Sequence, residues 1–183
     1  MLSILIVKFA CWLWILTFSL LANGILSKVN ILILSNMHPS NSYPYFLVVL
    51  QFLSLIIIAL TAPIVSSTVS GLLIECAGIF LGIHAIYTMK ITNMNITPMV
   101  KDGAHLVTSG IYKFVRHPMY LALIIAVIPL IVDYFTWFRG IIFLTLIVTL
   151  FAKIKYEEAL LIISFPKYLD YQKKSWRLIP YVY

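Results

Sequence analysis

The sequence predicts an all-α protein, a polytopic membrane helical bundle with about five transmembrane helices. Hydrophobic residues make up 62% of its 183 residues and charged residues only 10%, and the mean hydropathy is +1.03. Soluble domains contain roughly 45–50% apolar residues, so this composition excludes an ordinary soluble enzyme. A transmembrane helix needs about 20 mainly apolar residues, and several such runs leave no room for a separate soluble domain.

Five apolar segments account for most of the chain. They cover residues 2–21, 45–62, 69–89, 119–132 and 135–152. The first could be taken for a cleavable signal peptide, because Ala22 precedes a polar Asn23-Gly24 pair. Lys8 and the long apolar run after it favour a retained helix instead.

The basic residues predict the orientation of the bundle. Eleven of the thirteen Lys and Arg residues fall on one side if the N-terminus faces out. They are Lys28, Lys90, Lys101, Lys113, Arg116, Lys153, Lys155, Lys167, Lys173, Lys174 and Arg177. Since positively charged loops face the cytoplasm, the C-terminus is expected on the cytoplasmic side. The membrane itself is expected to be the plasma or inner membrane or that of the endoplasmic reticulum. The net charge of +7 then reflects topology and contact with anionic lipid headgroups, and we expect no nucleic-acid partner.

We expect one integral membrane domain over residues 1–183. Residues 1–89 would form the first three helices, and residues 90–183 a polar loop, a helical hairpin and an amphipathic tail. Cys11 and Cys76 both lie in apolar segments, where a thiol behaves as a small hydrophobe. Two such residues offer neither a disulfide framework nor zinc-ligand spacing, so no metal site is expected.

The helix expected over residues 69–89 carries small residues on one face. Gly71, Glu75, Gly78 and Gly82 recur at steps of four, three and four, which places them on one helical stripe. Small residues allow a neighbouring helix to approach closely, whereas a charged carboxylate is costly to bury in a membrane. We expect Glu75 to be a neutral acid that forms a hydrogen bond across the helix contact, or a substrate-binding residue, or to lie beyond the membrane boundary.

The stretch richest in polar side chains that can bind a ligand or take part in catalysis is GAHLVTSGIYKFVRHPMY, residues 103–120. Pro118 suits the first turn of a helix, where its missing N–H costs nothing. Arg116 and His117 would then lie at a helix N-terminus, where free amides and the helix dipole favour an anion. A simpler interpretation is that these two side chains contact lipid phosphates.

A second polar cluster follows the last apolar segment. Lys153 and Glu157 are four residues apart and share a face if the helix continues. A hairpin between the last two helices brings this cluster to the same membrane face as Arg116 and His117. The tail continues as an amphipathic helix to Pro166, and aromatic and basic residues alternate beyond it, which is typical of an interfacial anchor.

The motif RHPMY at residues 116–120, followed further along the chain by Glu157-Glu158, resembles the RHPxY and EE signature of membrane methyltransferases that use S-adenosylmethionine. The isoprenylcysteine carboxyl methyltransferases are the best-known family of this kind, and phospholipid methyltransferases are relatives. The similar region covers residues 103–180. The resemblance implies a cytoplasmic C-terminal cofactor-binding region and a lipophilic acceptor that enters from the bilayer.

The same resemblance implies roles for individual residues. Cofactor contacts are implied for Ala104, His105, Leu106, Val107, Tyr112, His117, Pro118, Met119, Tyr120, Glu157 and Glu158. Lys153 takes the place of a basic residue that resembles a clamp for the substrate carboxylate, and lysine instead of the usual arginine keeps the charge but loses the bidentate fork. The expected catalytic residues are Lys153 and Arg116, and the expected substrate-binding residues are Lys153 and Glu75.

These residue types also suit S-adenosylmethionine on chemical grounds. Tyr112 or Tyr120 can stack on the adenine, and Glu157 can accept hydrogen bonds from hydroxyl or ammonium groups. Arg116 or His117 can hold the carboxylate.

The type of acceptor is predicted from the chemistry of methyl transfer. Methyl transfer from a sulfonium is an in-line displacement, so alignment supplies most of the catalysis. A carboxylate arrives ionised and needs no base, whereas an amine must first lose a proton. The sequence therefore favours carboxyl O-methylation of a prenylcysteine-like substrate. A phospholipid N-methyltransferase, an NADPH-dependent sterol-type reductase and a non-enzymatic membrane scaffold are the alternatives.

Overall fold

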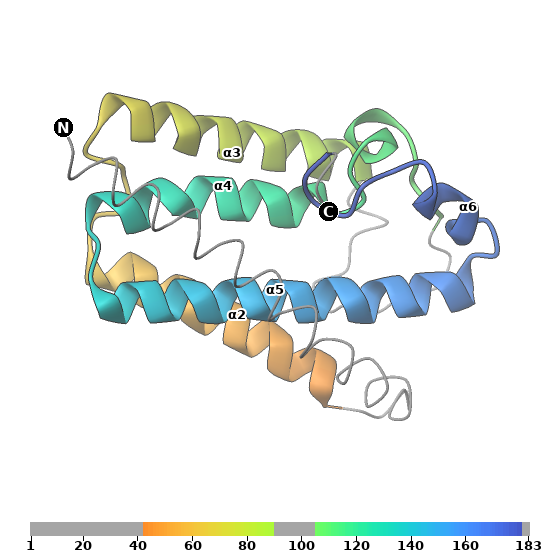
Figure 1. The fold of residues 1–183 in the computed structure, drawn as a ribbon, viewed down its shortest axis with the longest axis horizontal. Helices are drawn as coiled ribbons and strands as arrows, with labels where there is room; N and C mark the ends of the chain where they lie inside the picture. The colour runs from red at the N-terminus through yellow and green to blue at the C-terminus, as the bar shows by residue number, and fades with distance from the viewer. Residues whose placement is uncertain (1–41, 90–104, 181–183) are drawn as a thin grey trace. The chain divides into compact units, whose positions relative to one another are not determined.

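The computed structural model describes residues 42–89 and 105–180, which form a bundle of helices (Figure 1). The helices are α2 (Tyr43–Thr61), α3 (Val69–Met89), the 3₁₀ turn η2 (Gly110–Lys113), α4 (Pro118–Asp133), α5 (Trp137–Ser164) and α6 (Tyr168–Gln172). Among the described residues the one β contact is an isolated bridge between Val115 and Trp176. The predicted all-α fold is confirmed. The segment predicted at residues 2–21 lies outside the described residues, as does the loop at residues 90–104.

Three of the described helices, α2, α3 and α5, are long and apolar enough to cross a membrane. The fourth predicted segment forms α4, which is apolar but has 16 residues. That length is short for a helix that crosses a hydrocarbon core about 30 Å thick. Full transmembrane length is therefore confirmed for three of the predicted segments.

Local chemistry sets the start of α5. Thr136 is the N-cap, and its hydroxyl accepts a hydrogen bond from Arg139 N at 3.2 Å. The helix therefore begins at Trp137, two residues after its predicted start. It then runs unbroken to Ser164, so the polar residues beyond position 152 continue the same helix.

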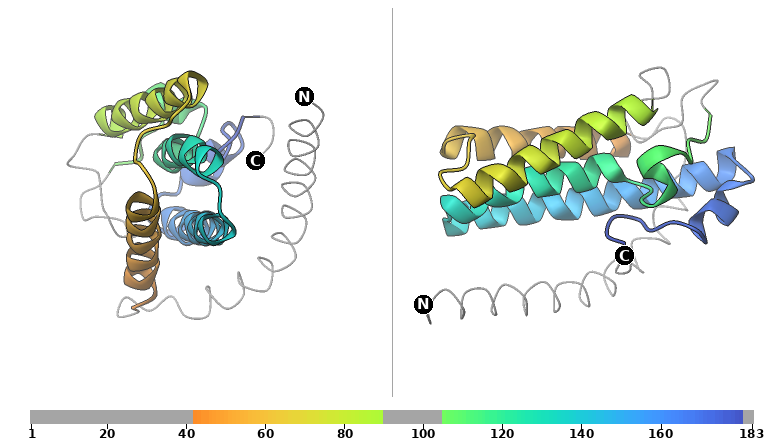
Figure 2. Two further views of the ribbon diagram at one scale, coloured as in Figure 1. Left: turned by 90° about the vertical axis from the view of Figure 1, so that its left-hand side faces the viewer. Right: turned by 90° about the horizontal axis from the view of Figure 1, so that it is seen from above.

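The helices pack in two pairs that meet at a hydrophobic core. α3 packs against α4 and α2 against α5, with α4 and α5 adjacent (Figure 2). The core cluster contains Ile58, Val127, Ile131, Leu146 and Leu150. Many outward-facing side chains of α2 and α3 are exposed hydrophobic residues, which is the composition of a helix that faces lipid.

Glycine allows α3 and α4 to pack at close range. A Cβ atom at Gly78 would lie 2.6 Å from Ala126 N and 2.9 Å from Ala122 O. Gly71, Glu75 and Gly78 are all buried. The predicted stripe of small residues therefore forms part of the interior face of α3, with Gly78 at its contact with α4.

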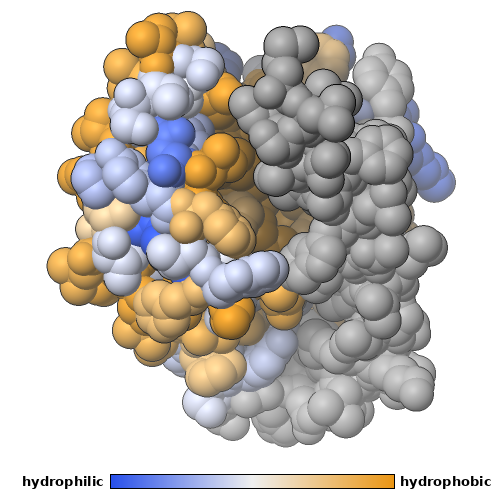
Figure 3. Space-filling view, turned by 60° about the vertical axis from the view of Figure 1, so that its left-hand side comes forward, coloured by the Kyte–Doolittle hydropathy of each residue, from blue (hydrophilic) through white to orange (hydrophobic). Residues whose placement is uncertain are grey.

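Polar contacts hold the end of the bundle formed by the α2–α3 and α4–α5 connections. Glu75 Oε2 accepts a hydrogen bond from Ser66 N at 3.0 Å. The prediction that Glu75 forms a hydrogen bond across the helix contact is wrong. Ser66 lies outside the helices, so its N–H needs an acceptor, and the Glu75 carboxylate provides it. Asp133 at the end of α4 accepts from Ser67 N at 2.7 Å. Figure 3, turned so that this end comes forward, shows hydrophilic residues gathered there beside hydrophobic flanks.

Arg139 joins three helices at the same end. It is buried, and its guanidinium donates to the carbonyl oxygens of Ile58 (3.0 Å) and Leu130 (2.9 Å) and to Thr61 Oγ1 (2.7 Å). These acceptors lie near the C-terminal ends of α2 and α4, where backbone carbonyls lack helical partners. The start of α5 is thus fixed to both neighbours.

Candidate functional site

A tight turn before α4 aims Tyr112 into the protein. Gly110 adopts a left-handed φ of 58°, and a Cβ atom there would lie 2.9 Å from Thr88 Cγ2. Both the conformation and the close approach require glycine. The following turn, η2, buries Tyr112.

The predicted start of α4 is confirmed. His117 is the N-cap residue and Pro118 occupies the first turn. The C-terminal tail holds the segment that leads into this helix, because Arg116 N donates to Trp176 O at 2.8 Å and His117 N donates to Arg177 O at 3.0 Å. With these backbone donors satisfied by the tail, the imidazole of His117 faces the carboxylates of α5.

Glu157 on α5 meets the side chain of Tyr120 on α4 and that of His117, the N-cap residue of α4. Tyr120 Oη donates to Glu157 Oε1, and His117 Nδ1 lies 3.4 Å from Glu157 Oε2. The rings of His117 and Tyr120 are stacked with centroids 5.7 Å apart. The two polar clusters predicted to lie at one level are therefore in direct contact.

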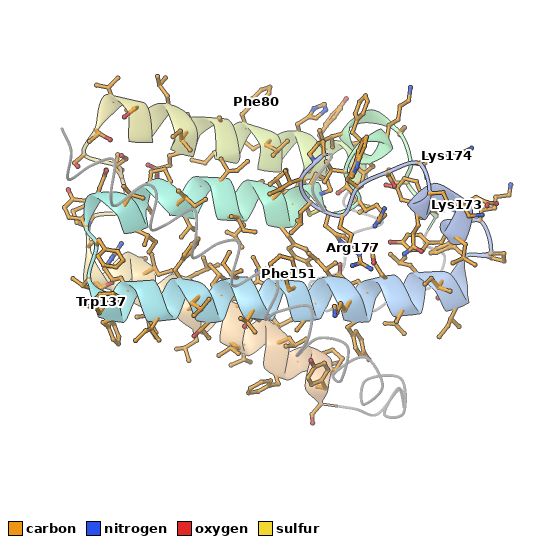
Figure 4. The ribbon with its side chains drawn as sticks, viewed as in Figure 1. Phe80, Trp137, Phe151, Lys173, Lys174 and Arg177 are labelled. Atoms are coloured by element: carbon orange, nitrogen blue, oxygen red, sulfur yellow. The ribbon has the colours of Figure 1, made fainter. Side chains whose placement is uncertain are left out.

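Glu158 forms a buried ion-pair centre behind Glu157. Its carboxylate accepts from Arg116 Nε and from Arg177 Nε, each at 2.7 Å, and it lies 3.6 Å from His117 Nε2. Figure 4 shows Arg177 pointing from the tail toward α5, whereas Lys173 and Lys174 point away from the bundle.

Arg116, an expected catalytic residue, is turned toward protein partners. Besides Glu158, its guanidinium donates to the backbone oxygens of Gln172 (3.1 Å) and Ser175. These contacts tie the tail to the start of α4. The catalytic role of Arg116 remains a prediction.

The electrostatics of the site favour a charged imidazole. Burial alone would lower the pKa of His117, but hydrogen bonds and charge interactions with Glu157 and Glu158 outweigh it. The pKa is therefore raised above its ordinary value of 6.5. Burial raises the pKa of Tyr171 to about 12, so its hydroxyl stays protonated and donates to Tyr112 O at 2.5 Å.

Lys153 lies one helical turn before Glu157 and is buried. Its Nζ donates to Gln51 Oε1 on α2 at 2.7 Å and sits 5.3 Å from the ring centroid of Tyr120. Lys153 therefore contacts the same tyrosine whose hydroxyl binds Glu157. Three helices, α2, α4 and α5, converge at this point.

The other predicted residues are distributed unevenly. Leu106 and Val107 are half-buried and His105 is exposed in the segment before η2, while Ala104 lies outside the described residues. Glu75 binds Ser66 near the opposite end of α4 from His117, so the structure does not bring it to the others. Its substrate-binding role remains a prediction.

Sequence reasoning missed four residues that contact the site or support it. They are Gln51, Tyr171, Arg177 and Tyr168, whose buried ring packs edge-on against that of Tyr171. An isolated amide in an otherwise apolar helix could have identified Gln51. For the three tail residues, the alternation of aromatic and basic side chains predicts an interfacial anchor. Nothing in their spacing indicates that the tail returns to the start of α4.

A comparison with protein families decides the class of the protein. The sequence model of the Isoprenylcysteine carboxyl methyltransferase (ICMT) family matches residues 71–163, half of the chain. The chain belongs to this family. Membership implies a membrane methyltransferase. A search of curated proteins finds no significant match.

The ICMT match covers one part of the site and leaves its residues from α2 and from the tail outside. It spans nearly all of α3, the whole of η2 and α4, and nearly all of α5, and so includes His117, Tyr120 and Glu157. Gln51 on α2 and Arg177 in the tail lie outside the matched residues. Within residues 42–89 and 105–180, no group of His, Cys, Asp and Glu side chains could hold a metal ion.

Proposed function

We propose that this ICMT-family protein uses S-adenosylmethionine to methylate the carboxylate of a prenylcysteine-like lipophilic acceptor. The observation that carries the proposal is the double contact of Tyr120. Its hydroxyl binds the Glu157 carboxylate, and its ring lies 5.3 Å from the Lys153 amine. An acidic group suited to a cationic cofactor and a basic group suited to an anionic acceptor thus flank one ring.

The residues beside Glu157 fit the cofactor. Tyr112 Oη is buried and has no hydrogen-bond partner among the described residues, and buried His117 Nε2 has only the Glu158 carboxylate nearby, at 3.6 Å. Buried polar atoms normally find partners, and the ribose hydroxyls, carboxylate and ammonium of S-adenosylmethionine offer them. Glu157 is the more accessible of the two carboxylates, with 23% of its side chain exposed against 4% for Glu158.

The proposed cofactor site comprises the aromatic, acidic and small residues before and along the start of α4, with the paired glutamates of α5. They are Ala104, His105, Leu106, Val107, Tyr112, His117, Pro118, Met119, Tyr120, Glu157 and Glu158. When bound, S-adenosylmethionine supplies an electrophilic methyl group on its sulfonium. Glu158 contributes indirectly, since its ion pairs hold Arg116 and the tail against the site.

Lys153 is the proposed contact for the acceptor carboxylate. An ammonium group attracts a carboxylate and can orient it, and orientation is the main requirement for in-line methyl transfer. The acceptor oxygen is already ionised at neutral pH, so no residue has to act as a base. The prenyl chain would lie against the exposed apolar faces of the helices.

The proposal is tested by binding and by transfer. Detergent-purified protein is titrated with S-adenosylhomocysteine, and labelled S-adenosylmethionine is then supplied with N-acetyl-S-farnesylcysteine. We expect saturable binding and label in the farnesylcysteine ester, and we expect Glu157→Gln to weaken S-adenosylhomocysteine binding at least tenfold.

Other outcomes identify the alternatives. Label that appears in ethanolamine phospholipids instead of the farnesylcysteine would indicate a phospholipid N-methyltransferase. Binding of NADPH without S-adenosylhomocysteine would indicate a reductase. Binding of neither, with no labelled product, would leave a non-enzymatic role.

A further inference from the structure

Gln51 is an amide in a helix made almost entirely of apolar residues. It lies midway along α2, faces the interior and is 9% exposed. A buried amide costs free energy unless it forms hydrogen bonds. Its Oε1 atom accepts a hydrogen bond from Nζ of Lys153, which is 102 residues away in the chain, so this contact fixes α2 against α5 at the candidate site.

The amide of Gln51 brings no negative charge to the lysine. Lys153 is 3% exposed, and within the described residues it forms no ion pair, unlike Arg116 and Arg177, which both pair with Glu158. A carbonyl oxygen and an aromatic ring both favour an ammonium group without neutralising it. Of the three N–H donors of that ammonium, one is used by Gln51.

We propose that Gln51 is a positioning residue, which holds the Lys153 ammonium toward Tyr120 and keeps its charge available for an anionic group of the acceptor. The inference deepens the proposed function and rests on it for the identity of the acceptor. A carboxylate at position 51 would neutralise the lysine and compete with the acceptor. An apolar side chain there would release the lysine from its position.

The location of Gln51 makes the inference distinct from the family assignment. α2 precedes the residues that match the ICMT family. The cofactor side of the site thus lies within the matched residues, while a determinant of acceptor charge lies on a helix outside them. α2 therefore takes part in selecting the acceptor as well as in facing lipid.

The test measures how strongly the full-length protein in detergent binds N-acetyl-S-farnesylcysteine and its neutral methyl ester. We expect the wild-type protein to prefer the acid. We expect Gln51→Glu to weaken binding of the acid at least tenfold and to leave ester binding within twofold of wild type. Ser54→Ala is the matched control, since Ser54 is buried on the same helix and its hydroxyl binds Leu50 O of that helix.

A double-mutant cycle separates positioning from an independent effect. Gln51→Met, Lys153→Met and the double variant are compared for acid binding. If Gln51 acts through Lys153, the double variant binds the acid no more weakly than Lys153→Met alone. Gel filtration and thermal unfolding establish that each variant is folded. If a variant at position 51 is not folded, Gln51→Asn, which shortens the amide side chain by one methylene, replaces it.

Two results from the variants would overturn the role of Gln51. One is a folded Gln51→Glu or Gln51→Asn variant that binds the acid as tightly as the wild-type protein does. The other is a double variant in which the affinity losses of Gln51→Met and Lys153→Met multiply. A wild-type protein without preference for the acid has the same consequence. These binding measurements need no methyl transfer. If the protein prefers the acid through Gln51 but transfers no methyl group, only the proposed function is defeated and the role of Gln51 stands.

Discussion

His117 makes the stability of the protein depend on pH. In the folded protein its pKa is raised above 6.5, so the folded state binds this proton more tightly than the unfolded state does. The resulting stabilisation is fully present below the unfolded pKa of about 6.5 and is lost as the pH rises through the folded pKa. We expect the thermal unfolding midpoint of detergent-purified protein to fall as the pH is raised from 6.5 through that value.

The matched variant for this prediction is His117→Gln, which keeps a polar side chain but cannot be charged. It should unfold at a lower temperature than wild type at pH 6 and lose the decline above pH 6.5. An unchanged decline in the variant would mean that another group causes it. Constant ionic strength is needed, because salt weakens the exposed ion pair of Lys173 with Asp170.

The two neighbouring glutamates should respond differently to the same substitution. Glu158→Gln leaves Arg116 and Arg177 without their shared carboxylate. Removing one partner of a buried pair costs about 3–5 kcal/mol, and we expect about 3 kcal/mol because Arg177 is partly exposed. Glu157→Gln should cost less stability and mainly weaken S-adenosylhomocysteine binding. Thermal unfolding and ligand titration of both variants check this, and equal loss of stability would contradict it.

At the scale of helices, two glycines of α3 offer a matched pair. A Cβ atom at Gly78 would collide with the backbone of α4, at 2.6 Å from Ala126 N, whereas one at Gly82 would meet only Ala122 Cβ at 3.5 Å. Gly78→Ala should therefore force the helices apart and cost about 1–3 kcal/mol. Gly82→Ala should be neutral or stabilise the helix by up to about 1 kcal/mol.

Thermal unfolding of the two alanine variants measures this difference directly. Both substitutions add one methyl group to the same helix, so propensity and hydrophobicity are matched. Similar midpoints for the two variants would show that the close approach of α3 and α4 contributes little. A lower midpoint for Gly78→Ala alone would locate the tight contact at that position.

The elements of the bundle were largely predictable, because their signals are local. Apolar length predicted α2, α3 and α5, glycine spacing predicted the interior face of α3, and Pro118 predicted the start of α4. The path of the tail was not predictable. Its bridge between Val115 and Trp176 joins residues far apart in the chain, and alternating aromatic and basic residues suit a membrane interface equally well.

At the scale of the whole described bundle, the pairing of helices could not be read from the sequence. A hairpin predicts that α4 and α5 are neighbours, but hydrophobic helices offer no signal for which partner α2 chooses. The contact between Gln51 and Lys153 depends on that choice. The sequence therefore predicted the acidic half of the site, which lies on consecutive helices, and missed the residue that α2 contributes.

The orientation of the protein in its membrane remains a prediction, and the two ends of the bundle allow a direct test. Lys174 is exposed beside α6, and Ser67 is exposed at the end where the α2–α3 connection meets Asp133. In a Cys11→Ser, Cys76→Ser background, we expect a membrane-impermeant maleimide to label Lys174→Cys only when the cytoplasmic face is accessible. Ser67→Cys should be labelled from the opposite face, because α2 and α3 each have transmembrane length. Labelling of both positions from one side would contradict a membrane-spanning bundle, and labelling of each from the reversed side would place the candidate site away from the cytoplasm.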